Sequence, residues 1–200
     1  MADIKHVLPF TNSWEGGPSR ATTDTASAHP SPWQYKGQYG WHTNRGVTFA
    51  AFEKWAPKFG YAVSSENFFN MPDDLWLKIA KVVYWDGLLL DNVNSDAIAA
   101  ALFNWTWGSG DTGAGRSLEK YLLTKGIVAK TDADQVAAIN KLSVLNEEKI
   151  FRELIDWRAA FFKSLNQPDN LQGWLNRLIY GSPGKISMLE LGLGLIKKKD

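Results

Sequence analysis

The chain has 200 residues, of which 44% are hydrophobic and 22% are charged, and its formal net charge is +1. This size and composition fit one compact soluble domain, or one domain with a small lobe, and exclude a disordered chain. The near-zero charge supplies no field that could hold phosphates, so we expect no nucleic-acid partner, and the absence of cysteine excludes disulfides and thiolate chemistry.

The first predicted element is a short helix over residues 4–14, whose apolar side chains fall on one stripe. The pair Gly16-Gly17 ends it, as glycine commonly does at helix C-termini. Glu15 is therefore expected at a helix end that faces a loop. Residues 18–41 have neither helical nor strand periodicity and mix Ser, Thr, Pro and Gly with aromatic residues, which predicts a long ordered loop or a small irregular lobe.

The rest of the chain is dominated by helical periodicity. Thr48 is a candidate N-cap, and the glycines of Gly108-Ser109-Gly110 are expected to break a helix. The predicted helices cover residues 49–59, 73–85, 95–107, 114–124, 132–140, 143–165 and 171–180. No stretch alternates as a core strand does. The predicted class is all-α or nearly so, with a small β-hairpin or irregular lobe inside residues 18–47.

Few side chains offer metal or nucleophile chemistry. The three histidines, His6, His29 and His42, have no partner at metal-ligand spacing, so we expect no metal. Ser109 lacks the nucleophile-elbow pattern. Carboxylates remain, and glycosidic cleavage requires one carboxyl that protonates the leaving oxygen and a second group that assists. Glu15 suits the first role because Trp14 and the aromatic loop beside it would limit its hydration, and a poorly hydrated carboxyl keeps its proton to higher pH.

An ordered set of motifs resembles glycoside hydrolase family 108, a family of muramidases. Its members pair a helix-ending Glu-Gly-Gly with a downstream Thr-Asn-Lys-Gly-Ile-Thr-like segment. The matching segments here are Trp14-Glu15-Gly16-Gly17, Thr43-Asn44-Arg45-Gly46-Val47-Thr48, Tyr84-Trp85-Asp86, Ala100-Ala101-Leu102-Phe103-Asn104, Gly108-Ser109-Gly110 and, in the peptidoglycan-binding part, residues 151–178.

This resemblance implies a lysozyme-like fold that hydrolyses the β-1,4 bond between N-acetylmuramic acid and N-acetylglucosamine. It implies that Glu15 is the catalytic acid and that no cofactor is needed. It also implies a catalytic region over residues 1–110 and a helical peptidoglycan-binding region over residues 111–200. The expected partner is the peptidoglycan glycan strand, and we expect a monomer.

The second catalytic group is left open by two departures from the family pattern. Pro18 stands where an aromatic residue usually follows Glu-Gly-Gly, and an insertion rich in Pro and aromatics replaces the expected Asp-Pro-Gly-Gly stretch. Asp24 is the nearest acidic residue after Glu15 and either assists catalysis or caps a loop. Thr48 either holds the attacking water or serves only as an N-cap.

Aromatic and amide side chains near these motifs are candidates for sugar binding. Aromatic faces stack on sugar rings, and amides hydrogen-bond acetamido groups. The candidate substrate-binding residues are Trp41, Asn44, Tyr84, Trp85, Asn104 and Trp107.

Two other classes of protein fit the same motifs. One is a lysozyme-like protein that binds peptidoglycan, or assists secretion, without turnover; the other is a chitinase or lytic transglycosylase.

Because the first ten residues lack the apolar core of a signal peptide and no run could span a bilayer, we expect synthesis in a bacterial or phage-infected cytoplasm. Action in the periplasm or cell wall would then follow export or lysis.

Overall fold

The computed structural model describes residues 1–198, which divide into two compact units. We call residues 1–14 together with the chain from Tyr84 onward the helical unit, and Glu15–Val83 the loop-rich unit. Helices dominate, and the described residues contain a single two-stranded sheet, so the predicted mainly α class is confirmed. No helix within residues 1–198 combines the length and the apolar character that a membrane span requires.

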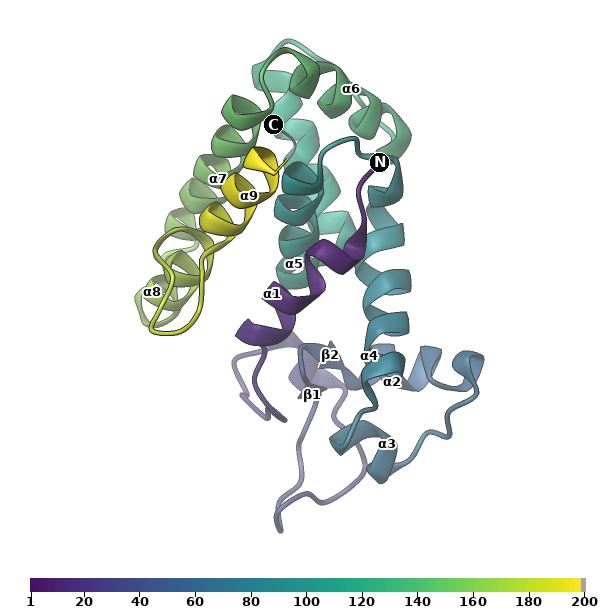
Figure 1. The fold of residues 1–200 in the computed structure, drawn as a ribbon. Helices are drawn as coiled ribbons and strands as arrows, with labels where there is room; N and C mark the ends of the chain where they lie inside the picture. The colour runs from purple at the N-terminus through teal and green to yellow at the C-terminus, as the bar shows by residue number, and fades with distance from the viewer. Residues whose placement is uncertain (199–200) are drawn as a thin grey trace. The chain divides into compact units, whose positions relative to one another are not determined.

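The helical unit is built around the long helix α5, which packs against α6, α7 and α9 (Figure 1). Short 3-10 turns at Ile4–His6, Asp86–Leu88 and Leu90–Asn92 and a π-helical turn at Asn176–Tyr180 link its helices. The α-helices of this unit are α1 (Leu8–Trp14), α5 (Asp96–Thr124), α6 (Asp132–Leu145), α7 (Glu147–Ser164), α8 (Pro168–Leu175) and α9 (Met188–Lys197).

Helix α5 joins two segments that the sequence analysis separated. The predicted helices over residues 95–107 and 114–124 are its two halves, and Gly110 interrupts them with φ 69° and ψ 167°. Only glycine adopts this conformation at little cost, so the predicted break at Gly108-Ser109-Gly110 takes the form of a kink. Ser95 begins the helix by accepting a hydrogen bond from the backbone N–H of Ile98.

The loop-rich unit contains a β-hairpin, β1 (Thr43–Asn44) and β2 (Val47–Thr48), followed by α2 (Phe49–Trp55), a 3-10 turn at Pro57–Phe59, α3 (Ser65–Phe69) and α4 (Asp73–Ala80). Thr43 pairs with Thr48, and Arg45 and Gly46 both have positive φ, as a tight hairpin turn requires. The small hairpin predicted as one alternative inside residues 18–47 is present, at residues 43–48. Phe49, Phe52 and Phe68 are buried together and form the aromatic core of this unit.

Several predicted boundaries were wrong. The predicted helix over residues 49–59 is α2 plus the 3-10 turn, and the one over residues 73–85 is α4 plus a π-helical turn at Lys81–Trp85. Asn146 caps α7 through Lys149 N, so α6 extends to Leu145 and α7 begins later than residue 143. The helix predicted over residues 171–180 is α8, which begins earlier at Pro168, followed by a π-helical turn.

Two helices were not predicted. Helix α3 has five residues, too few for a periodic pattern. Helix α9 contains Gly192 and Gly194 between leucines, so its apolar residues alternate as in a strand and its helix propensity is low. A sequence signal for α9 does exist, because Ser187 and Glu190 form a capping box at its start.

Candidate functional site

Glu15 directly follows Trp14, the last residue of α1, as the sequence predicts, and its side chain is half-buried. The helical unit fixes Trp14. Its indole N–H donates a hydrogen bond of 2.9 Å to the carbonyl of Ile186, and the Lys185 ammonium lies 5.4 Å from its ring centroid. The Phe10 ring packs against it one turn earlier, at 6.4 Å. Three contacts within the helical unit therefore hold the residue that precedes Glu15.

Asp24 lies on the exposed part of the inserted loop. Its carboxylate accepts a hydrogen bond of 2.9 Å from the backbone N–H of Ala26 and caps the 3-10 turn Thr25–Ala28. The loop-capping role considered for Asp24 is thus observed, and one of its two carboxylate oxygens makes the capping bond.

Thr48 ends β2 and is the N-cap of α2. Its hydroxyl oxygen accepts a hydrogen bond of 3.3 Å from the backbone N–H of Ala51, so the predicted capping role is also observed. Accepting this bond uses a lone pair of the oxygen and leaves the hydroxyl proton for a second partner.

The two other candidates in the loop-rich unit differ in accessibility. Asn44 is 2% exposed, and its amide donates hydrogen bonds to the carbonyls of Phe68 and Phe69, at 2.6 and 3.1 Å. It therefore ties the hairpin to α3. Trp41 is half-buried, its indole N–H bonds the carbonyls of Tyr35 and Gln38, and the Arg20 guanidinium lies 5.8 Å from its ring.

In the helical unit, Tyr84 and Trp85 are buried. The indole N–H of Trp85 donates a hydrogen bond of 2.7 Å to Asp91, and the Tyr84 ring lies 4.5 Å from that of Trp107. Trp107 is only partly buried. Tyr84 therefore contacts Trp107 directly, whereas Trp85 packs against Phe103, whose ring in turn contacts Trp107.

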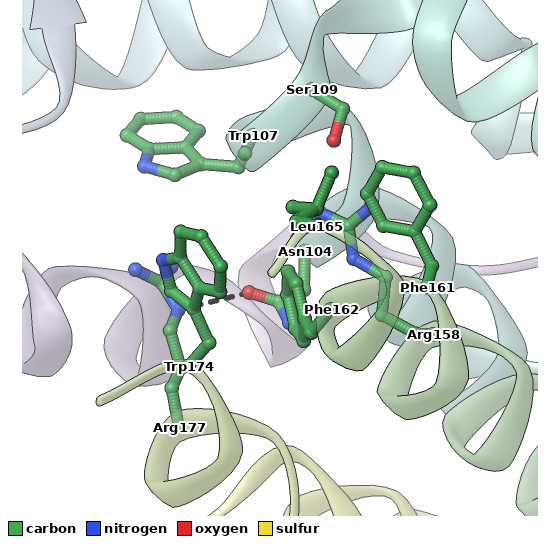
Figure 2. Close-up of a pocket in the computed structure, with 10 residues that line it drawn as sticks. Asn104, Trp107, Ser109, Arg158, Phe161, Phe162, Leu165, Trp174 and Arg177 are labelled. Atoms are coloured by element: carbon green, nitrogen blue, oxygen red, sulfur yellow. Dashed lines mark hydrogen bonds between the residues drawn. The ribbon is translucent and has the colours of Figure 1, made fainter. Parts of the chain in front are cut away.

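Asn104 and Trp107 line a cavity of about 190 Å³ between α5, α7, α8 and the π-helical turn that follows α8 (Figure 2). The Asn104 side-chain oxygen accepts a hydrogen bond of 2.9 Å from Nε of Arg177. The other lining residues are Gly108, Ser109, Arg158, Phe161, Phe162, Leu165 and Trp174. Our site prediction did not include these side chains, although Arg158 interrupts the apolar stripe of α7 and was a visible signal.

No group of three or more His, Cys, Asp or Glu side chains within residues 1–198 is arranged to hold a metal ion.

Comparison with known proteins identifies the family. The model of the family described as Glycosyl hydrolase 108 matches residues 8–110, which is more than half of the chain. The chain belongs to glycosyl hydrolase family 108. Family membership makes it a glycosidase, and the resemblance predicted from its motifs is confirmed.

A solved structure shares the fold of this family 108 chain. The structure of Brucella abortus SagA superposes with a TM-score of 0.66 at 21% identity, covering 96% of this chain and 94% of that one. No curated protein matches the sequence. All nine predicted site residues lie in the matched range of residues 8–110, whereas Arg158 and Arg177 lie outside it.

Proposed function

We propose that this glycosidase is an N-acetylmuramidase that cleaves the β-1,4 bond between N-acetylmuramic acid and N-acetylglucosamine in peptidoglycan. The observation that carries the proposal is the place of Glu15: it lies within the family match, at the end of α1, next to the anchored Trp14. A proton donor must keep its position relative to the leaving oxygen, and a fixed neighbour limits how far its backbone moves.

In the proposed reaction Glu15 donates its proton to the glycosidic oxygen as the bond to the anomeric carbon breaks. Positive charge develops on the sugar ring, water attacks the anomeric carbon, and the proton that the attacking water loses restores the acid form of Glu15. We assign Thr48 to hold this water through its hydroxyl proton, because the N-cap bond orients the oxygen. Asp24 is the candidate that would stabilise the positive charge with its carboxylate.

Sugar binding is proposed for the accessible members of the predicted set. Trp41 and Trp107 are each partly exposed, and Asn104 lies on a cavity wall. Asn44, Tyr84 and Trp85 are buried, and we assign them to the support of these residues. The enzyme would need no cofactor and would act on the cell wall after export or lysis.

The variant Glu15→Gln tests the proposal. Gln has nearly the same shape but no acidic proton, so the rate of peptidoglycan solubilisation should fall by roughly 100- to 10,000-fold while the melting temperature stays unchanged. Glu66→Gln, an exposed glutamate of α3, is the matched control and should keep the parental rate.

Mass spectrometry of the released muropeptides identifies the bond. A muramidase leaves reducing N-acetylmuramic acid ends. Anhydro ends would instead identify a transglycosylase, and a folded Glu15→Gln variant with the parental rate would remove Glu15 from catalysis. If the parental protein binds peptidoglycan but releases no fragment, it is a non-catalytic binding or secretion-accessory protein.

A further inference from the structure

Arg158 is a buried charged residue in the middle of α7. It is 4% exposed, and its guanidinium carbon lies 5.1, 5.2 and 4.4 Å from the ring centroids of Trp105, Phe161 and Phe162. Its Nε and Nη1 atoms are buried and have no hydrogen-bond partner among residues 1–198. Aromatic faces attract the cation but cannot accept the hydrogen bonds of its N–H groups as an anionic oxygen does.

A second arginine adds positive charge to the same place. Burial, and then the charge of Arg177, lower the pKa of Arg158 to about 9, so the group remains protonated near neutral pH. No carboxylate of the described residues offsets this effect or forms an ion pair with Arg158. Buried charges are normally paired, because an unpaired one loses its hydration without compensation. Among the described residues, Arg158 therefore lacks the anionic partner that a buried charge usually has.

The two arginines line one open cavity rather than a closed core. In Figure 2 the rings of Trp107 and Trp174 lie to the left of the Arg158 guanidinium and that of Phe161 to the right. At Gly108 an added Cβ would lie 3.1 Å from Nη2 of Arg158, so the missing side chain keeps this nitrogen uncovered. A volume of about 190 Å³ accommodates a small group and is below the usual size of a site that encloses a whole ligand.

We propose that this cavity is a carboxylate-binding site, in which Arg158 and Arg177 receive the carboxylate and the surrounding aromatic rings contact its apolar substituent. A planar carboxylate matches the fork of a guanidinium, and the tryptophan and phenylalanine rings favour a carboxylate that carries an apolar group over a fully hydrated anion. If the proposed function holds, the carboxylates are those of the short peptides attached to muramic acid, and the site distinguishes peptide-bearing strands from bare glycan. This last step rests on the proposed function, whereas the anion site itself does not.

The site can be observed directly by nuclear magnetic resonance of the arginine Nε–H groups in the full chain. The probes are acetate, N-acetylalanine and N-acetyl-D-alanyl-D-alanine, each compared with its amide, and inorganic phosphate. We expect the Arg158 signal to shift with the carboxylates and not with the amides. Phosphate binding as tight as that of the best carboxylate would assign the site to phosphoryl groups and overturn the proposal, as would a lack of response to every carboxylate.

Two variants and a control locate the binding. Arg158→Met removes the charge but keeps much of the side-chain volume, and Gly108→Ala retains the charge while placing a methyl group beside Nη2. Each should weaken carboxylate binding by about 10-fold or more, and Gly108→Ala remains informative if Arg158→Met does not fold. Arg152→Met, on the exposed face of α7 where Arg152 pairs with Glu148, should leave binding unchanged.

Glu15→Gln separates this inference from the proposed function. It should bind the carboxylate probes as the parental protein does, whatever its hydrolytic rate. Unchanged affinity in folded Arg158→Met and Gly108→Ala would overturn the carboxylate site and leave the muramidase proposal intact.

Discussion

Thr48 illustrates how one side chain can serve structure and chemistry at once. Its oxygen caps α2 by accepting from Ala51, and its hydroxyl proton is the part that we assign to water. These two roles are separable because asparagine is also a good N-cap but presents a larger amide in place of the hydroxyl.

We expect Thr48→Asn to keep the melting temperature and to reduce peptidoglycan hydrolysis at least about 10-fold, because the water would be displaced by an ångström or more. Thr48→Ala should lose about 1 kcal/mol of unfolding free energy as well, since it removes the cap. Thermal unfolding and turbidity assays on both variants provide the readouts. A Thr48→Asn protein with the parental rate would show that Thr48 is a helix cap only.

Asn44 shows where prediction at the residue scale fails. The sequence places it in a family motif, and an amide there could equally bind a sugar or the backbone. In the structure its amide nitrogen donates hydrogen bonds to the carbonyls of Phe68 and Phe69, more than twenty residues away in the sequence. Such a contact depends on how the hairpin meets α3, and no local sequence pattern contains that information.

Among the elements, α7 and α9 pack so closely at Gly192 that no side chain fits there. A Cβ added to Gly192 would lie 2.0 Å from Cζ of Phe151, whose ring is fully buried. Gly194 lies on the same helix, and a Cβ there would meet nothing within 4 Å. The two glycines of α9 therefore have different reasons to be present.

Gly192→Ala should lower the free energy of unfolding by about 1–3 kcal/mol, because overpacking outweighs the gain in helix propensity of about 1 kcal/mol. Gly194→Ala should keep that propensity gain without the clash and raise the free energy by up to about 1 kcal/mol. Urea unfolding of the two variants measures both effects. Equal stability of the two would contradict the close packing of α9 on Phe151.

Helix α9 also marks the limit of prediction from periodicity. The apolar stripes of α2, α4 and α7 are visible in the sequence because their polar and apolar residues recur at helical spacing. In α9, glycines separate the leucines, so tertiary packing against α5 and α7 decides the helix. The Arg158 cavity could not be predicted from local sequence patterns for a similar reason, since its walls come from α5, α7, α8 and the π-helical turn that follows α8.

For the molecule as a whole, acid stability depends on carboxylates that are charged in the folded state. Glu153 of α7 lies 2.7 Å from the Lys125 ammonium and accepts a hydrogen bond of 2.8 Å from the Tyr121 hydroxyl. These interactions, led by that with Lys125, lower the pKa of Glu153. A lowered pKa stabilises the fold at a pH above the value of the unfolded chain, and this contribution is lost as the pH falls through the folded value.

Glu153→Gln should therefore lower the free energy of unfolding near neutral pH by up to about 1 kcal/mol, a modest value because the pair is partly exposed. The difference from the parental protein should shrink towards about pH 3, below the usual glutamate pKa of about 4.3. Urea midpoints at the two pH values test this, with Glu148→Gln as a control in a more exposed pair. A difference that does not change with pH would assign the effect to packing instead of charge.

The anchoring of Trp14 has a consequence for biosynthesis. Its indole bonds Ile186, 172 positions later in the chain, and its ring meets Lys185. During translation α1 is made well before these partners, because 172 positions separate Trp14 from Ile186. The nascent chain therefore cannot make this bond beside Glu15 until Ile186 has been synthesised, so a chain that stops before Ile186 lacks this element of the proposed site.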